Sequence, residues 1–134
     1  MRGASLLLVL LGAGVASGVA MAGGDVDDRY RWNLNDLYQT GEEFIAARAA
    51  LAARLDELEK GKGTLAASPA ALKQSLDTMY GLAKELSRLF AYAAMRSDED
   101  TRVPENLGAL QEMQQLAATF GAKSAWLAPE ILAL

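Results

Sequence analysis

Apolar side chains recur at helical spacing in three segments of the chain. In the first segment they lie three or four positions apart and form one stripe: Phe44, Ala47, Leu51, Leu55 and Leu58. Thr40 and Glu43 have the spacing of a capping box, in which two side chains bind backbone N–H groups at the start of a helix. Gly61 and Gly63 suit the end of a helix, because glycine adopts the left-handed conformation without steric penalty. The pattern predicts a helix over residues 41–60.

The second segment carries the longest stripe. Its apolar residues alternate in steps of four and three: Leu72, Leu76, Met79, Ala83, Leu86, Phe90 and Ala93. Ser68 is a typical N-cap and Pro69 a typical first helical residue, so we expect a helix over 69–96. A heptad-like stripe of this length needs a partner helix along it. Leu82 and Leu89 lie beside the stripe, and we expect them to remain partly exposed.

The third segment follows a polar break at residues 97–101. Its stripe has the same spacing: Leu110, Met113, Ala117, Phe120 and Leu127, with Leu107 and Leu116 beside it. We expect Asp100 or Thr101 to cap this helix, with Pro104 in its first turn. The helix should run to about Leu127, before Pro129 interrupts it.

No segment alternates apolar and polar residues with a period of two, so the fold class is predicted to be all-α. The second and third helices are joined by a short connection and share a heptad-like period. We therefore expect them to pair as an antiparallel hairpin, with the first helix packed against it.

The N-terminus has the three parts of a secretory signal peptide. Arg2 is followed by an apolar run, and small residues Ala20 and Ala22 occupy the two positions that a signal peptidase reads. Cleavage is expected before Gly23. The alternative is an uncleaved membrane anchor, which the glycines of the run disfavour by lowering its hydrophobicity. The sequence thus predicts an exported protein, periplasmic or secreted, without stable membrane insertion after cleavage.

The chain then divides into a signal peptide at 1–22, a flexible linker at 23–31 and a helical domain at 32–134. Residues 1–22 contain one basic residue and no acidic residue, so their removal lowers the formal charge from −4 to −5. A net negative charge disfavours nucleic acid as a partner, because binding to phosphates requires a basic face.

Histidine and cysteine are both absent from the 134 residues. Without cysteine there is no disulfide framework, so the fold depends on apolar packing. Without histidine the chain lacks the commonest general base and the commonest metal ligand.

Two clusters of polar or aromatic residues are candidate sites. Residues 32–38 are consistent with an aromatic platform, but we favour a turn packed on the bundle, with Asn33 or Asn35 capping a short helix. The carboxylates of Asp98, Glu99 and Asp100 lack the glycine and spacing of a calcium loop. Capping of the third helix explains them better, because acids are stabilised near a helix N-terminus.

Three segments together carry a resemblance. The matching residues are Trp32, Leu34, Asp36, Leu37 and Tyr38 of a Trp-x-Leu-x-Asp-Leu-Tyr opening, Asp98, Asp100 and Thr101 of an Asp-x-Asp-Thr turn, and Pro129 and Glu130 of a Pro-Glu-Ile-Leu segment. In order and spacing, they resemble the N-terminal region of oligoendopeptidase F-like zinc metallopeptidases, a family related to the thimet oligopeptidases. The resemblance spans nearly all of residues 30–134.

The resemblance implies a longer parent protein that hydrolyses oligopeptides. Its zinc would be held by a His-Glu-x-x-His helix and a downstream Glu in a C-terminal catalytic domain, while residues 32–134 would form a helical lobe beside the substrate channel. None of these zinc-binding positions occurs in the chain. We therefore expect a truncated, non-catalytic fragment with no catalytic residue, metal ligand or cofactor of its own. The alternative is a stand-alone exported helical bundle that binds a partner as an adaptor.

Overall fold

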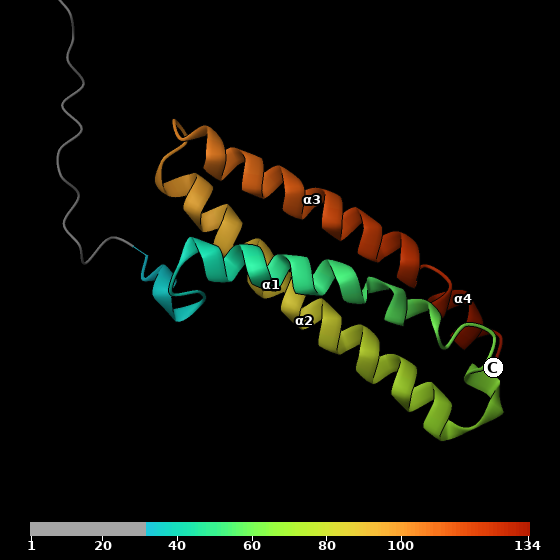
Figure 1. Cartoon of the computed structure of the whole chain (residues 1–134). Helices are drawn as coiled ribbons and strands as arrows, with labels where there is room; N and C mark the ends of the chain where they lie inside the picture. The colour runs from blue at the N-terminus through green and yellow to red at the C-terminus, as the bar shows by residue number, and fades with distance from the viewer. Residues whose placement is uncertain (1–31) are drawn as a thin grey trace, which may run out of the picture. The chain divides into compact units, whose positions relative to one another are not determined.

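The computed structural model describes residues 32–134. The predicted signal peptide, its cleavage residues Ala20, Ala22 and Gly23, and the linker at 23–31 lie outside the described residues. All elements of the described part are helical, as the sequence predicts. In chain order they are the 3-10 helix η2 (Leu34–Asp36), α1 (Gly41–Arg54), the 3-10 helices η3 (Leu55–Glu59) and η4 (Leu65–Ala67), α2 (Pro69–Glu99), α3 (Pro104–Ser124) and α4 (Leu127–Leu132) (Figure 1).

Helix α1 begins at its predicted cap and ends earlier than predicted. The Thr40 hydroxyl accepts the Glu43 backbone N–H at 3.1 Å. The Glu43 carboxylate binds the backbone N–H of Gln39 rather than that of Thr40, so the capping box is shifted by one residue. After Arg54 the chain tightens into η3. Three residues per turn place Leu55 and Leu58 on one side, and both are buried.

Helix α2 begins at the predicted cap, where Ser68 Oγ accepts the Ala71 N–H at 3.1 Å. It continues three residues beyond the predicted end, to Glu99. The expectation that Leu82 and Leu89 stay partly exposed is wrong, since each is 1 % exposed. Because α2 packs against both α1 and α3, the centre of its buried face lies between the two neighbours and coincides with these leucines.

Helix α3 begins without a side-chain cap. Its N-cap residue is Val103, so neither Asp100 nor Thr101 caps it as predicted. Asp98 instead lies in the last turn of α2. The helix ends at Ser124, before the predicted Leu127, and α4 follows with Pro129 in its first turn, where a missing N–H is harmless.

The core lies where α1, η3 and α3 meet α2. Its buried residues are Phe44, Leu51, Leu55, Leu58, Leu82, Leu89, Tyr92, Ala93 and Met113. Helix α2 makes its most extensive contacts with α3, while η3 bridges to both of these helices. Direct contacts between α1 and α3 are sparse, although the two ribbons lie near each other in Figure 1.

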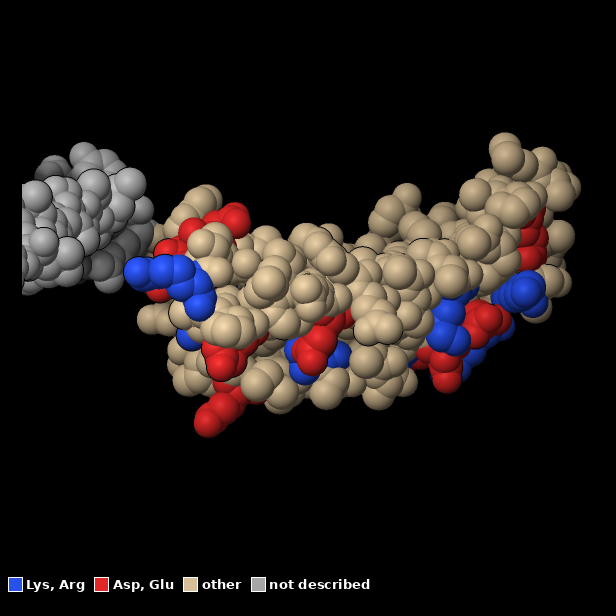
Figure 2. Space-filling view, turned by 90° about the horizontal axis from the view of Figure 1, so that it is seen from above, with Lys and Arg blue, Asp and Glu red and all other residues tan. Residues whose placement is uncertain are grey.

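Charged side chains on the face shown in Figure 2 form separate clusters of both signs rather than a continuous basic surface. None of the helices within residues 32–134 combines the length and the apolar character needed to cross a membrane.

Candidate functional site

The N-terminal motif docks on the core through three of its residues. Leu34, Leu37 and Tyr38 are partly buried and pack against the core cluster. The Tyr38 ring meets Phe44 edge-on at 5.9 Å between centroids and Tyr92 at 5.3 Å. The predicted packing of Trp32 is wrong, because 60 % of this residue is exposed. The motif therefore serves mainly to anchor the N-terminal segment on the core.

Polar contacts also hold the N-terminal motif in place. Asn33 Nδ2 donates to Asp36 Oδ1 at 2.9 Å across η2, although Asn33 forms no side-chain cap to the backbone. The Arg88 guanidinium lies 5.0 Å from the centroid of the Tyr38 ring and donates to the Leu37 carbonyl. Burial raises the pKa of the Tyr38 phenol, while Arg88 acts in the opposite direction.

The acidic turn is neutralised locally. Arg102 binds Asp100 through two side-chain N–H groups at 2.9 Å each and donates its backbone N–H at 3.0 Å. These bonds lower the pKa of the Asp100 carboxyl to about 2. Asn106 Nδ2 donates to the Arg96 carbonyl at 3.0 Å and links α3 to the end of α2. Thr101 is exposed in the turn.

The C-terminal motif holds the loop that leaves η3. Trp126 Nε1 donates to the Leu58 carbonyl at 3.1 Å. The Glu130 carboxylate accepts the backbone N–H groups of Gly63 at 2.8 Å and Leu65 at 3.0 Å. Gly63 has a φ of 78°, the left-handed conformation that glycine tolerates best. Glu130 therefore stabilises this turn, which the sequence pattern attributes to its glycines alone.

An ion-pair cluster reinforces the same end of the unit. Lys123 Nζ of α3 lies 2.8 Å from carboxylate oxygens of both Asp56 and Glu59. Hydrogen bonding to these carboxylates, Asp56 first, raises the pKa of Lys123. The same contact lowers the pKa of Asp56. The contacts link η3 to α3.

The three motif segments do not converge on one site. The acidic turn precedes α3 and the Pro129–Glu130 segment follows it, so the 21 residues of this helix separate them. At 1.5 Å per residue, that is roughly 30 Å. Within residues 32–134, no group of three or more acidic side chains is arranged to hold a metal ion.

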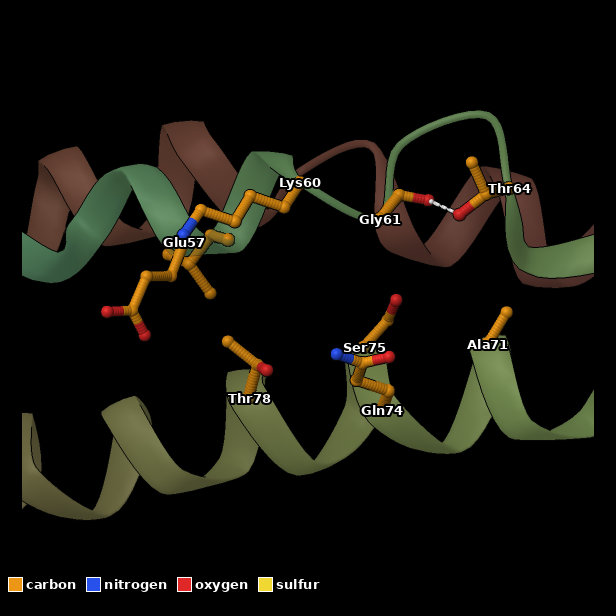
Figure 3. A pocket seen from close by; sticks show the side chains of 9 residues that line it. Glu57, Lys60, Gly61, Thr64, Ala71, Gln74, Ser75 and Thr78 are labelled. Carbon is orange, nitrogen blue, oxygen red and sulfur yellow. Dashed lines mark hydrogen bonds between the residues drawn. The ribbon is translucent and has the colours of Figure 1, made fainter.

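A polar pocket of about 260 Å³ lies between α2 and the η3–η4 segment (Figure 3). Its lining residues are Glu57, Leu58, Lys60, Gly61, Thr64, Ala71, Gln74, Ser75 and Thr78. The Ser75 side chain points toward Gly61, and the Thr64 hydroxyl donates to the Gly61 carbonyl at 2.8 Å. No nucleophile–base pair is among the lining residues, so the pocket offers polar contacts rather than catalysis.

Gly61 lies at a close approach across this pocket. A Cβ atom at residue 61 would lie 2.1 Å from Ser75 Oγ and 3.2 Å from Ser75 Cβ. Trp126 would lie 3.4 Å away on another side. The sequence marked Gly61 only as a helix stop, because nothing local reveals that α2 and Trp126 meet there.

Two adjoining hollows of about 470 and 340 Å³ lie between α1 and α3. Both are lined by Arg48 and Glu112, which form an ion pair across the gap. No pattern in the sequence predicts these hollows. The exposed Ile45, off the predicted apolar stripe of α1, was the available signal.

Comparison with known proteins gives one consistent group of relatives. The chain is 32 % identical over 103 residues to "Oligopeptidase PepF" of Bacillus subtilis, covering 77 % of this chain and 15 % of that protein. It is 26 % identical over 109 residues to "Oligoendopeptidase F, plasmid" of Lactococcus lactis subsp. cremoris. It is 25 % identical over 109 residues to "Group B oligopeptidase PepB" of Streptococcus agalactiae. Each of these two matches covers 81 % of this chain and 18 % of the relative. The chain thus spans less than a fifth of the length of these relatives. No protein-family model and no solved structure matches it.

Proposed function

The chain is a homologue of the oligoendopeptidase F peptidases over some four-fifths of its length, and on this premise we propose that it forms the N-terminal helical lobe of an exported zinc metalloendopeptidase that hydrolyses oligopeptides. The supporting observation is the match itself, which covers 77 % of this chain and 15 % of the Bacillus subtilis oligopeptidase. The activity then resides in the parent protein, and its substrates are oligopeptides.

The lobe in this proposal is non-catalytic. The sequence contains neither histidine nor cysteine. Asp100, an acid of the family motif, is engaged by Arg102, and Glu130 is engaged by two backbone N–H groups. These donors do not fit a catalytic zinc ion, which takes three protein ligands and keeps one position open for water. Zinc would be bound by another part of the parent protein.

The role left to the lobe is structural. We infer that α2 and α3 form an antiparallel hairpin with α1 packed on it. The short connection between Glu99 and Pro104 and the Asn106–Arg96 hydrogen bond support this arrangement. A stiff lobe of this kind can flank the substrate channel of the parent protein and restrict access to short peptides.

Export belongs to the same proposal. Arg2, the apolar run and the small residues Ala20 and Ala22 support a cleaved signal peptide at residues 1–22, followed by a linker at 23–31. The parent peptidase would then act in the periplasm or outside the cell, without a stable membrane span or a nucleic-acid partner.

The test is to sequence the gene beyond the codon for Leu134 and assay its purified product. We expect a continuing reading frame that encodes His-Glu-x-x-His, and a product whose hydrolysis of an oligopeptide is abolished by a chelator and restored by zinc. The 134-residue chain serves as the matched control and should show no hydrolysis. A stop codon after Leu134, with an inactive product, would favour the stand-alone adaptor.

A further inference from the structure

The polar pocket between α2 and the η3–η4 segment has two walls that the fold already holds in place. One wall belongs to α2, the longest helix within residues 32–134. The other wall is held by residues that follow α3. Trp126 Nε1 donates to the Leu58 carbonyl at 3.1 Å, and the Glu130 carboxylate accepts the Gly63 N–H at 2.8 Å. A pocket with ordered walls binds a ligand at a small conformational cost.

The α2 wall carries two hydroxyl groups, those of Ser75 and Thr78. A serine or threonine inside a helix commonly bonds to the carbonyl four residues earlier, as the Thr119 hydroxyl does with the Gln115 carbonyl at 3.0 Å. Figure 3 draws the residues four positions before Ser75 and Thr78 as well, and none of the hydrogen bonds drawn there involves either hydroxyl. Both hydroxyls can therefore bind a ligand in the pocket.

Charged groups lie at one end of the pocket and uncharged polar groups at the other. In Figure 3 the side chains of Glu57 and Lys60 both extend away from Gly61. The opposite end contains the Gln74 amide and the Ser75 hydroxyl. One end thus offers an acid beside a base, and the other offers donors and acceptors without charge.

We infer that this pocket binds a free α-amino acid with an uncharged polar side chain, such as glutamine. An α-amino acid carries its ammonium and its carboxylate on one carbon, so both ionic groups can meet Glu57 and Lys60 at the same end. Its side-chain amide then lies beside Gln74 and Ser75. An apolar side chain would instead leave these polar groups without partners.

The size of the pocket agrees with such a ligand. Its volume of about 260 Å³ equals that of roughly nine water molecules at about 30 Å³ each, which is close to the size of an amino acid. The inference goes beyond the proposed function, because it adds a ligand site to the lobe and does not depend on peptidase activity.

NMR spectroscopy of the nitrogen-15-labelled 134-residue chain tests the inference, with L-glutamine as the probe. The backbone amide signals of Gly61, Ser75 and Thr78 should shift in a saturable way, with a Kd in the millimolar range or below. L-Leucine has a similar size and an apolar side chain. It should bind at least about tenfold more weakly, because a site that hydrogen-bonds a polar group rejects a ligand that lacks it.

Two variants test the charged end of the pocket. Lys60→Met and Glu57→Gln each remove one charge and nearly preserve the length of the side chain, and each should weaken the binding of L-glutamine at least about tenfold. Lys62→Met is the matched control, because Lys62 is exposed and lies outside the lining residues.

Three results would overturn the inference. They are the absence of saturable shifts at the three amides, equal affinity for L-glutamine and L-leucine, and equal losses of affinity in Lys60→Met and Lys62→Met. Each result would leave the proposed function intact, because the peptidase activity is measured separately on the parent protein. An inactive parent protein would refute the proposed function and would not affect the binding measurement.

Discussion

Glu130 and Gly63 are 67 positions apart, yet the Glu130 carboxylate accepts the Gly63 backbone N–H at 2.8 Å. The same carboxylate binds the Leu65 N–H at 3.0 Å. A residue of the C-terminal motif therefore determines the path of the chain between η3 and η4. Glu130 thus has a structural role within the described residues.

Glu130→Ala should lower the free energy of unfolding by about 1 kcal/mol, because it removes the acceptor of one exposed and one partly buried backbone N–H. Glu130→Gln keeps one acceptor oxygen and should cost less. Glu99→Ala is the control, since Glu99 is an exposed acid at the end of α2. Urea denaturation measures the change, and hydrogen exchange at Gly63 and Leu65 should accelerate in Glu130→Ala alone. Unchanged exchange at both amides would show that Glu130 does not hold this turn.

Gly61→Ala should destabilise the protein by about 1–3 kcal/mol, because the new methyl group overlaps Ser75. Gly81→Ala is the matched control. A Cβ at residue 81 meets nothing within 4 Å, and alanine favours a helix interior by up to about 1 kcal/mol. Adding Ser75→Ala to Gly61→Ala should recover part of the loss. Equal melting temperatures for the two single glycine variants would contradict the close approach.

Phe44→Ala and Ile45→Ala change adjacent residues of α1 that differ sharply in burial. Phe44 is 4 % exposed and its ring stacks on Tyr92 at 4.9 Å between centroids, so its removal should cost about 3–5 kcal/mol. Ile45 is 54 % exposed, and its truncation in the 134-residue chain should cost less than about 1 kcal/mol. Chemical denaturation of both variants checks the orientation of α1, and a reversed order of costs would show that it is wrong.

The Asp100 carboxyl should contribute to stability only above acidic pH. Arg102 lowers its pKa to about 2 from an ordinary value of 3.8, so the contribution is complete above pH 4 and disappears as the pH falls toward 2. Asp100→Asn should therefore melt below the wild type at pH 7 and match it near pH 2. Asp98→Asn, two residues away and exposed, is the control. A gap between wild type and Asp100→Asn that persists at pH 2 would refute the assignment.

Export should yield a mature chain that begins at Gly23. Ala22→Arg places a bulky charge at a position that the signal peptidase reads and should block cleavage. Met21→Leu lies between the two such positions and should leave cleavage unchanged. N-terminal sequencing of the exported product distinguishes the outcomes, and a membrane-bound wild-type chain that retains Met1 would favour the anchor.

Local signals in the sequence predicted the helices more accurately than they predicted the contacts between the helices. The caps at Thr40 and Ser68 were found because each depends on residues within three positions. The burial of Leu82 and Leu89 was missed because it depends on two neighbouring helices at once. The roles of Glu130 and Gly61 were missed for the same reason, since their partners are distant in sequence or lie on other elements. The two hollows between α1 and α3 likewise arise from the spacing of helices, which no single stripe encodes.

The hydrogen bond between Glu130 and Gly63 also implies a time interval during synthesis. Gly63 is made 67 residues before the side chain that holds its N–H. At about 5–20 residues per second, that partner follows roughly 3 to 13 seconds later. Until then the turn after η3 has no fixed path, and the nascent lobe cannot close at this end. The segment that contains Glu130 can therefore close this end of the lobe only after α3 has been made.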